Sequence, residues 1–276
     1  MRRVTGTSID ELVSLLSGST SVVALTGAGC STESGIPDYR DANGDWKQRQ
    51  PVQYQDFVAS RAMRQRYWAR SMIGWQRVAT ARPNAAHFAL TKLENCGTLG
   101  RIITQNIDRL HQQAGSKTVI DLHGRLDRVV CLTCSSSVSR GELQQQLISR
   151  NPGWRDIEAV AAPDGDASVE ADFGNFSVVS CHSCGGVLKP DVVFFGESVP
   201  RTRVTRAMAA VEAADVLLVV GSSLMVWSGL RFVRRAAERG IPTVLVNLGR
   251  TRADELFTHR ITGRCSEVLS QIAQAT

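Results

Sequence analysis

The chain has 276 residues, a formal net charge of +6 and a hydrophobic fraction of 43%. This length suits one large domain, or one domain with a small insertion, and the hydrophobic fraction is ordinary for a globular protein. No apolar run reaches the roughly 20 residues that a membrane span needs, and the N-terminus lacks the apolar stretch of a signal peptide. We therefore expect a soluble intracellular protein with no membrane partner.

Arginine supplies most of the positive charge, with groups within residues 61–70 and 231–235. Such groups attract anionic partners, for example a phosphate-rich cofactor or nucleic acid. The chain has no DNA-binding motif and no aromatic residues interleaved with a basic patch. We interpret the arginines as solvated helix faces and expect no direct nucleic-acid partner.

The predicted elements begin with a helix over Ile9–Leu16, which Ser8 and Glu11 open as a capping box. Five short apolar runs then predict buried parallel strands. These runs are Val22–Leu25, Arg101–Thr104, Val192–Phe195, Val216–Val220 and Thr243–Val246. Helical patterns separate most of them, at residues 83–94, 200–213, 229–239 and 263–275. Strands that alternate with helices predict an α/β fold with a Rossmann-like doubly wound parallel sheet.

Two segments do not follow this alternation. Residues 41–82 are polar and then helical, and residues 125–188 hold two cysteine pairs around an acidic stretch. We predict a single domain over residues 1–276 in which these two insertions form a smaller lobe, helical in the first and metal-binding in the second. The large Rossmann-like lobe would comprise residues 1–40, 83–124 and 189–276.

The loop Gly27–Arg40 follows the first predicted strand and begins Gly-Ala-Gly. A strand that leads into a Gly-x-Gly turn suggests backbone amides pointing at a phosphate. Thr32 stands where the dinucleotide fingerprint has its third glycine, and a polar segment continues to Arg40. We infer that this loop acts on a nucleotide in addition to holding its phosphates.

Polar motifs follow the predicted strands where those strands end. The motifs are Gly27-Ala28-Gly29, Gln105-Asn106-Ile107-Asp108, His123-Gly124, Gly221-Ser222-Ser223 and Asn247-Leu248-Gly249. In open α/β sheets the ligand crevice lies beyond the carboxyl ends of the strands. The five motifs therefore predict one composite site.

His123 is the candidate general base of this site, because histidine has the unperturbed pKa closest to neutral. The alternative is a histidine that only bonds a loop carbonyl. Asn106 and Asp108 are candidates for recognition of a carboxamide or sugar, and equally for plain helix capping. His111 shares a helix face with Asp108 and is interpreted as a decoy.

Cys131-x-x-Cys134 and Cys181-x-x-Cys184 have the spacing of two zinc knuckles. Four thiolates close a tetrahedral Zn²⁺ site and leave no open position for chemistry. We predict one structural zinc ion that stabilises a small lobe with little core of its own. His182 lies inside the second knuckle and is a competing ligand that four cysteines make unnecessary.

Residues 189–197 form an apolar run that ends in Gly196-Glu197. The run is typical of a core strand. The alternative is a backbone edge that pairs with an extended peptide.

Taken in chain order, these motifs resemble the sirtuins, which are NAD-dependent protein deacylases of the Sir2 type. The resemblance covers nearly the whole chain, through residues 27–40, 104–108, 122–124, both cysteine pairs, 189–197, 221–223 and 247–249. Arg125–Cys131 and Arg66–Arg70 look most like the class II branch, which contains bacterial enzymes and one mitochondrial lineage. We expect a monomer in the bacterial cytoplasm, or in the mitochondrion if the source is eukaryotic.

The resemblance implies that NAD and an acylated lysine of a protein or peptide give nicotinamide, free lysine and O-acyl-ADP-ribose. It implies catalytic roles for His123, Asn106, Asp108, Gln105 and Arg40. The residues implied to bind NAD are Gly27, Ala28, Gly29, Ser31, Thr32, Pro37, Asp38, Tyr39, Arg40, Gln105, Asn106, Ile107, Asp108, His123, Gly221, Ser222, Ser223, Asn247, Leu248, Gly249 and Cys265. The backbone of Val193, Phe195 and Gly196 is implied to pair with the substrate.

Tyr67-x-x-Arg70 resembles the pair with which sirtuin desuccinylases hold an acidic acyl chain. At positions i and i+3 the two side chains share a helix face, and an arginine can clamp a carboxylate through two hydrogen bonds. The alternative is an ordinary arginine in an arginine-rich helix. Our hypothesis is that acidic acyl groups are removed at least as well as acetyl.

Three other functions stay open from the sequence. Mono-ADP-ribosyl transfer to protein uses the same NAD cleavage with another acceptor. A non-catalytic NAD-sensing or zinc-dependent interaction module would need no base, and the presence of His123 and Asn106 counts against it. A hydride-transferring dehydrogenase conflicts with the missing third glycine at Thr32.

Overall fold

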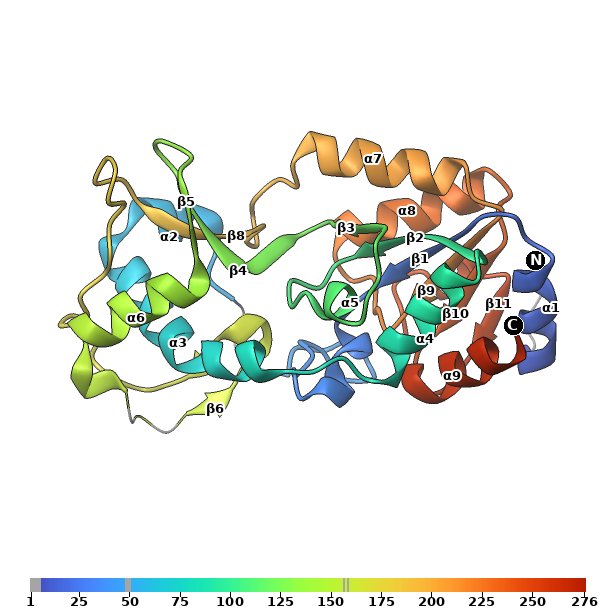
Figure 1. Ribbon diagram of the computed structural model, residues 1–276, viewed down its shortest axis with the longest axis horizontal. Coiled ribbons are helices and arrows are strands. Elements are labelled where there is room, and N and C mark those ends of the chain that lie inside the picture. Colours follow the sequence, from blue (N-terminus) through green and yellow to red (C-terminus); the bar gives the residue numbers. More distant parts are fainter. Residues whose placement is uncertain (1–5, 48–50, 156, 158) are drawn as a thin grey trace.

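The computed structural model describes residues 6–47, 51–155, 157 and 159–276. Its larger lobe contains a six-stranded sheet with the order β11-β10-β9-β1-β2-β3, in which every neighbouring pair is parallel (Figure 1). The strands are β1 (Val22–Thr26), β2 (Leu99–Thr104), β3 (Val119–Asp121), β9 (Val216–Val220), β10 (Thr243–Val246) and β11 (His259–Ile261). This is the Rossmann strand order, and the order reverses between β1 and β9.

Helices cover both faces of this sheet. One face packs against α1 (Ile9–Ser17), α4 (Ala85–Asn95) and α9 (Cys265–Ala275), and the other against α7 (Arg201–Glu212) and α8 (Trp227–Glu238) (Figure 1). Val22 and Ala24 of β1 belong to the first core, whereas Val23 and Leu25 belong to the second. Successive strand residues face opposite sides, so a strand covered on both sides must be apolar throughout.

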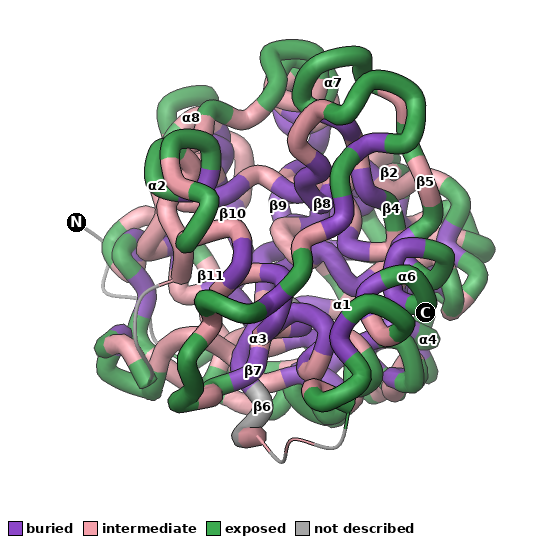
Figure 2. Tube along the Cα trace, turned by 90° about the vertical axis from the view of Figure 1, so that its left-hand side faces the viewer, coloured by how far each residue is buried: buried purple, intermediate pink, exposed green. Residues whose placement is uncertain are grey.

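The smaller lobe holds a third core and an antiparallel sheet. The sheet has the order β5-β4-β8, with β4 (Gly124–Cys131), β5 (Ser137–Ser139) and β8 (Leu188–Val192). The remaining elements are α2 (Tyr54–Ala59), α3 (Arg61–Thr80), α6 (Arg140–Arg150) and the strands β6 (Val160–Ala161) and β7 (Ala167–Ser168). Figure 2 looks onto this lobe and shows much of α3 and β8 buried behind exposed outer loops.

Short helical segments complete the described chain. They are α5 (Leu110–Gln113) and the 3-10 turns η1 (Ala28–Cys30), η2 (Thr32–Ser34), η3 (Pro152–Trp154), η4 (Pro163–Gly165) and η5 (Asp254–Leu256). No helix within the described ranges is both long and apolar enough to cross a membrane.

The predicted α/β fold with a parallel sheet is confirmed, and one predicted strand is wrong. Val192–Phe195 was expected in the parallel sheet, but the strand is Leu188–Val192 and pairs antiparallel with β4 in the smaller lobe. An apolar run alone cannot tell a parallel central strand from another buried strand. The edge strand β11 gave no apolar signal, because all three of its residues are only half-buried. The limits of the two lobes stay a prediction.

Candidate active site

A cavity of about 1250 Å³ lies at the carboxyl ends of β1, β2, β9 and β10, where the two lobes meet. It is lined by all of the residues that the resemblance assigned to NAD, from Gly27 of the first loop to Cys265 of α9. Val193, Phe195 and Gly196 line it as well. The structure thus brings the strand-end motifs together, while the individual roles of these residues stay predictions.

Two glycine segments meet backbone to backbone at the sheet reversal. Gly29 N donates to Gly221 O at 2.8 Å, and Gly27 N donates to Val220 O at 3.0 Å. Gly221 has a φ of +59°, and a Cβ there would lie 2.4 Å from Cys30 N. A side chain would therefore separate the two segments. The bare backbone of this cradle suits the phosphates of a dinucleotide.

Ser31 and Asn106 are held together with Asp108 beside this cradle. The Ser31 hydroxyl donates to Asp108 Oδ2 at 2.6 Å, and Asn106 Nδ2 donates to Gly27 O and to Ser31 Oγ, both at 3.0 Å. Asp108 Oδ1 also accepts from Leu110 N at 2.9 Å, but the N-cap residue of α5 is Arg109, so neither Asn106 nor Asp108 caps this helix as the alternative expected. Burial raises the pKa of Asp108.

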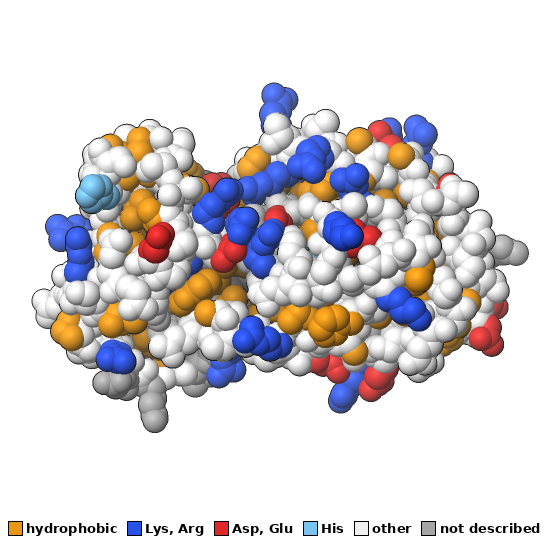
Figure 3. Space-filling view, viewed as in Figure 1, with side chains coloured by type: hydrophobic (Ala, Val, Ile, Leu, Met, Phe, Trp, Pro, Cys, Tyr) orange, Lys and Arg blue, Asp and Glu red, His pale blue; other side chains and the backbone are white. Residues whose placement is uncertain are grey.

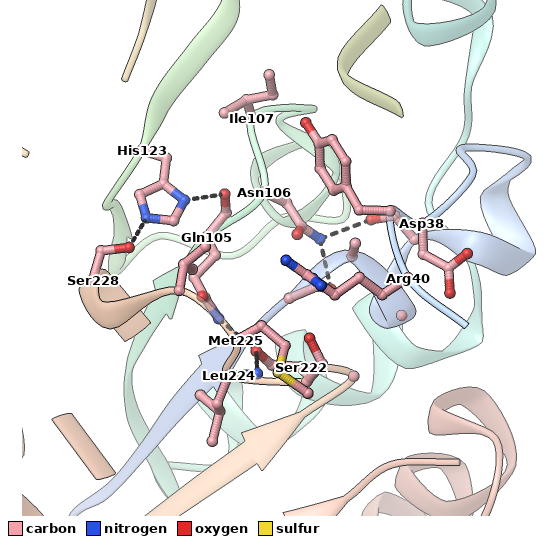
Figure 4. A pocket seen from close by; sticks show the side chains of 18 of the residues that line it. Asp38, Arg40, Gln105, Asn106, Ile107, His123, Ser222, Leu224, Met225 and Ser228 are labelled. Atoms are coloured by element: carbon pink, nitrogen blue, oxygen red, sulfur yellow. Dashed lines mark hydrogen bonds between the residues drawn. The ribbon is translucent and has the colours of Figure 1, made fainter. Parts of the chain in front are cut away.

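His123 has one ring nitrogen fixed and the other directed at a hydroxyl (Figure 4). Nδ1 lies 2.9 Å from Gln105 O, and a carbonyl can only accept, so Nδ1 carries the proton. Nε2 then holds the lone pair and accepts from Ser228 Oγ at 2.7 Å. The ring therefore bonds a loop carbonyl and also keeps the tautomer that a base acting through Nε2 needs.

Burial lowers the pKa of His123 to about 4, and the positive charges of Arg203 and Arg231 act in the same direction. The hydrogen bond to Gln105 opposes this change. The ring is therefore neutral near pH 7, as a general base must be.

Tyr39 and Trp46 form an aromatic wall of the cavity, and Arg40 stacks on Trp46. The Arg40 guanidinium lies 4.0 Å from the Trp46 ring centroid and donates to Gly44 O at 2.7 Å. Tyr39 packs edge-on against Trp46 and Phe195. Opposite, Gln105 Nε2 donates to Ser222 Oγ at 2.9 Å (Figure 4).

His111 lies behind the site, as the decoy interpretation predicts. It is fully buried, bonds Thr26 Oγ1 at 2.9 Å and packs against His87 at 4.8 Å between ring centroids. The ligand atoms of Cys30, His87 and His111 lie within 4.8 Å of one another, close enough to hold a metal ion. However, His87 Nδ1 accepts from Asn84 N at 3.2 Å, so its other nitrogen carries a proton and has no lone pair for a metal.

The four predicted zinc ligands do cluster. Their sulfur atoms all lie within 4.8 Å of one another, with Cys131 to Cys184 at 3.5 Å and Cys134 to Cys181 at 3.7 Å. Zn–S bonds of about 2.3 Å at tetrahedral angles place sulfurs roughly 3.8 Å apart. The cluster is therefore compatible with a zinc site. His182 is exposed and is not part of it.

Tyr67 and Arg70 do not line the main cavity. They line a second cavity of about 250 Å³ that shares Tyr39, Trp46 and Phe194 with the first. Arg70 is already engaged there, since its Nη2 pairs with Asp166 Oδ2 at 2.8 Å and its Nε donates to Ala167 O at 2.7 Å.

Several lining residues were missed in the sequence. Met225, Trp227, Ser228 and Arg231 all line the main cavity. They follow the Gly221-Ser222-Ser223 motif where the chain passes from a strand end into α8. That position was the available signal, because residues beyond strand ends face the ligand crevice.

The fold and cavity together define an α/β protein with a dinucleotide site between two lobes. The sequence model described as the Sir2 family matches residues 27–228, and the chain belongs to this family. An NAD-dependent protein deacetylase of Xanthomonas campestris pv. campestris (strain 8004) is 58% identical over 251 residues, which cover 91% of this chain and 86% of that protein. One from Bordetella bronchiseptica is 54% identical and covers 96% and 97%. A solved structure described as "Sir2-p53 peptide-NAD+" has a TM-score of 0.81 at 31% identity and covers 97% of this chain and 98% of its own.

Proposed function

We propose that this protein is an NAD-dependent protein-lysine deacylase of the class II sirtuin branch. Its products would be nicotinamide, the free lysine and O-acyl-ADP-ribose. The observation that carries the proposal is His123, which is neutral, has its lone pair on Nε2, and lines the same cavity as the glycine cradle. The family membership and the names of the relatives support it.

NAD would supply an activated bond between ribose and nicotinamide. Gly27, Ala28, Gly29 and Ser222 would hold its phosphates: the two glycines let the phosphates approach closely, and Ala28 N and Ser222 Oγ would donate, because Gly27 N and Gly29 N already donate to carbonyls. The carboxamide of nicotinamide would lie against Asn106, Asp108 and their partner Ser31.

His123 Nε2 would accept a proton from a ribose hydroxyl. The hydroxyl of Ser228 occupies that nitrogen in the described structure, so the ribose hydroxyl must replace it. Gln105 would keep the ring in position through its backbone carbonyl throughout.

The substrate peptide would pair with the backbone that follows β8. Two groups there are already used, since Val193 N donates to His123 O and Phe195 O accepts from Tyr54 N, both at 2.8 Å. Phe195 also forms a parallel bridge with Gln53, so Val193 O would be the group that accepts from an extended peptide. This pairing is the β-augmentation mode, in which main-chain bonds give affinity without reading the peptide sequence.

The acyl chain would point into the second cavity toward Arg70. Asp166 already places a carboxylate on Arg70, so an acidic acyl group gains only the difference between its own bond and that of Asp166. We therefore propose that succinyl and glutaryl are removed at least as well as acetyl, with a preference of less than about tenfold.

Asp166→Asn and Arg70→Ala test this acyl preference through kcat/KM on succinyl-, glutaryl- and acetyl-lysine peptides. Asp166→Asn is expected to raise the ratio of acidic to acetyl substrates, and Arg70→Ala to lower it. A ratio that neither variant changes would mean that Arg70 only fastens the segment around Ala167.

One zinc ion at Cys131, Cys134, Cys181 and Cys184 is part of the proposal, as is a monomer in the bacterial cytoplasm. The bacterial source of the relatives supports this location. Metal analysis and light scattering of the purified protein test the zinc content and the oligomeric state.

The decisive experiment incubates the protein with NAD and an acetyl-lysine peptide, follows nicotinamide release and identifies the products by mass spectrometry. O-acetyl-ADP-ribose is expected, and His123→Ala should lower kcat about 10²- to 10⁴-fold. His259→Gln is the matched control, because His259 lies on β11 outside the cavity. An ADP-ribosylated protein, NAD binding without turnover, or NADH formation would each overturn the proposal.

A further inference from the structure

The first two turns of α8 carry a basic face beside the main cavity. Trp227, Arg231 and Arg234 stand at positions i, i+4 and i+7 and share one side of the helix. Trp227 is 51% exposed, and the Arg234 guanidinium lies 5.2 Å from its ring centroid. Arg201, the first residue of α7, lines the same cavity as Trp227 and Arg231. We call Arg201, Arg231 and Arg234 the mouth arginines.

The mouth arginines have no carboxylate partner among the residues that the structure describes. Other arginines of the same two helices do: Arg203 pairs with Asp191 and Arg235 with Glu212. Figure 3 shows basic side chains gathered along α7 and over the lobe junction, with acidic side chains among them. Within the described part of the chain, no ion pair therefore compensates the charge of the mouth arginines, whereas Arg203 and Arg235 on the same two helices are paired.

The mouth arginines lie close to the catalytic centre. Ser228, the neighbour of Trp227, bonds His123, and the charge of Arg231 acts on the His123 ring. Residues 193–199 and 224–228 line the same cavity. A peptide that presents its lysine to His123 must pass close to Trp227 and the mouth arginines.

We propose that the mouth arginines select acyl-lysine substrates with acidic residues next to the modified lysine. The inference rests on the proposed deacylase function and adds the class of peptide. Unpaired arginines attract aspartate and glutamate and repel the basic flanks of lysine-rich tails, and Trp227 offers an apolar surface to the peptide between them. Backbone pairing after β8 does not depend on the peptide sequence. The side chains of Trp227 and the mouth arginines would therefore distinguish one peptide sequence from another.

Three acetyl-lysine peptides of one core sequence test the inference, with aspartate, asparagine or lysine at the two positions on each side of the modified lysine. The value of kcat/KM, measured by nicotinamide release, is expected to fall in that order. Exposed ion pairs between arginine and aspartate predict that kcat/KM differs about 3-fold to 20-fold between the first two peptides at 25 mM salt. The difference should shrink at 300 mM salt, because salt screens exposed charges.

Arg201→Gln combined with Arg234→Gln should bring the aspartate and asparagine peptides to within about twofold of each other. Arg239→Gln is the control for a lost charge on α8, since Arg239 is exposed at the opposite end of this helix and the substitution removes one of the two positive charges that the double variant loses. It should retain the wild-type order.

Equal kcat/KM for the three peptides in the wild type would overturn the inference. So would an equal effect of Arg239→Gln, or a change confined to the KM for NAD, which would assign the arginines to the dinucleotide. In these cases the asparagine peptide still releases nicotinamide. Failure of every peptide to do so would instead refute the deacylase function.

Discussion

The ionisation of His123 makes a prediction about the pH dependence of the reaction. Burial and the charges of Arg203 and Arg231 lower the pKa of His123 to about 4. A general base works only while deprotonated, so activity falls as pH decreases through this pKa. We expect the acid limb of the pH profile near pH 4, far below the ordinary histidine value of about 6.5.

The size of the effect follows from the two pKa values. At pH 5.5 a histidine with a pKa of about 4 is about 97% neutral, whereas one with a pKa of about 6.5 is only about 9% neutral. Between pH 8 and pH 5.5 the rate should therefore stay nearly constant, where an unperturbed histidine would lose about tenfold.

The assay measures nicotinamide release at subsaturating NAD and acetyl-peptide, where the rate reports the free enzyme. The peptide has uncharged flanks, so that the mouth arginines do not affect its binding. Arg231→Gln removes a charge that lowers the pKa of His123 and should move the limb to higher pH. Arg239→Gln should leave the limb in place.

Asp108 is the other buried group of the site whose ionisation could give an acid limb. Its pKa is raised by burial, but Arg231 is not among the groups that shift it. A limb that Arg231→Gln moves therefore belongs to His123. A wild-type limb near pH 6.5, or one that Arg231→Gln leaves unchanged, would refute the reasoning.

Three further predictions concern the fold. Burial lowers the pKa of His87 to about 4, so its contribution to stability is complete above pH 6.5 and falls by about 3 kcal/mol as pH decreases toward 4; urea unfolding at pH 7 and 4.5 measures the pH dependence, and His87→Gln, which retains the helix cap, should reduce it by this share while His111 and His123, whose pKa values burial also lowers, keep the rest. Chelation of zinc, or Cys134→Ser, should lower the melting temperature and the zinc content together, and a zinc-free protein with unchanged melting would contradict a structural metal. Gly221→Ala places a Cβ 2.4 Å from Cys30 N at a φ of +59° and should weaken NAD binding at least tenfold by calorimetry, whereas Gly240→Ala, also at positive φ but in open space, should only lower stability.

The parallel sheet could be predicted because its strands are covered on both faces. β9 and β10 have no exposed residue, and their bounds match the predicted ones. The same apolar pattern led us to assign Val192–Phe195 to the wrong sheet, because a strand buried in the small lobe has a similar apolar run. Which sheet a strand joins depends on pairing between distant residues, such as Gly124 with Val192, and periodicity carries no information about it.

The site could be predicted as a set of residues but not as a set of interactions. The position of Arg70 on a helix face was predicted, yet its partner Asp166 lies 96 positions further along the chain, in the acidic stretch between the two cysteine pairs. A long-range ion pair has no spacing rule, unlike pairs at i and i+4. The acyl preference therefore depends on a contact that only the folded chain reveals.

His123 illustrates the same limit at the catalytic centre. Its position after a strand end marked it as a base, but a base also needs one tautomer and a lowered pKa. The tautomer comes from the carbonyl of Gln105, and every residue has a carbonyl, so the sequence gives no sign of it. The pKa comes from burial between the lobes and from charges on α7 and α8. Because Arg231 both lowers this pKa and lies at the cavity mouth, a substitution there should change the acid limb and the peptide preference together, which links the catalytic group to the surface that selects its substrate.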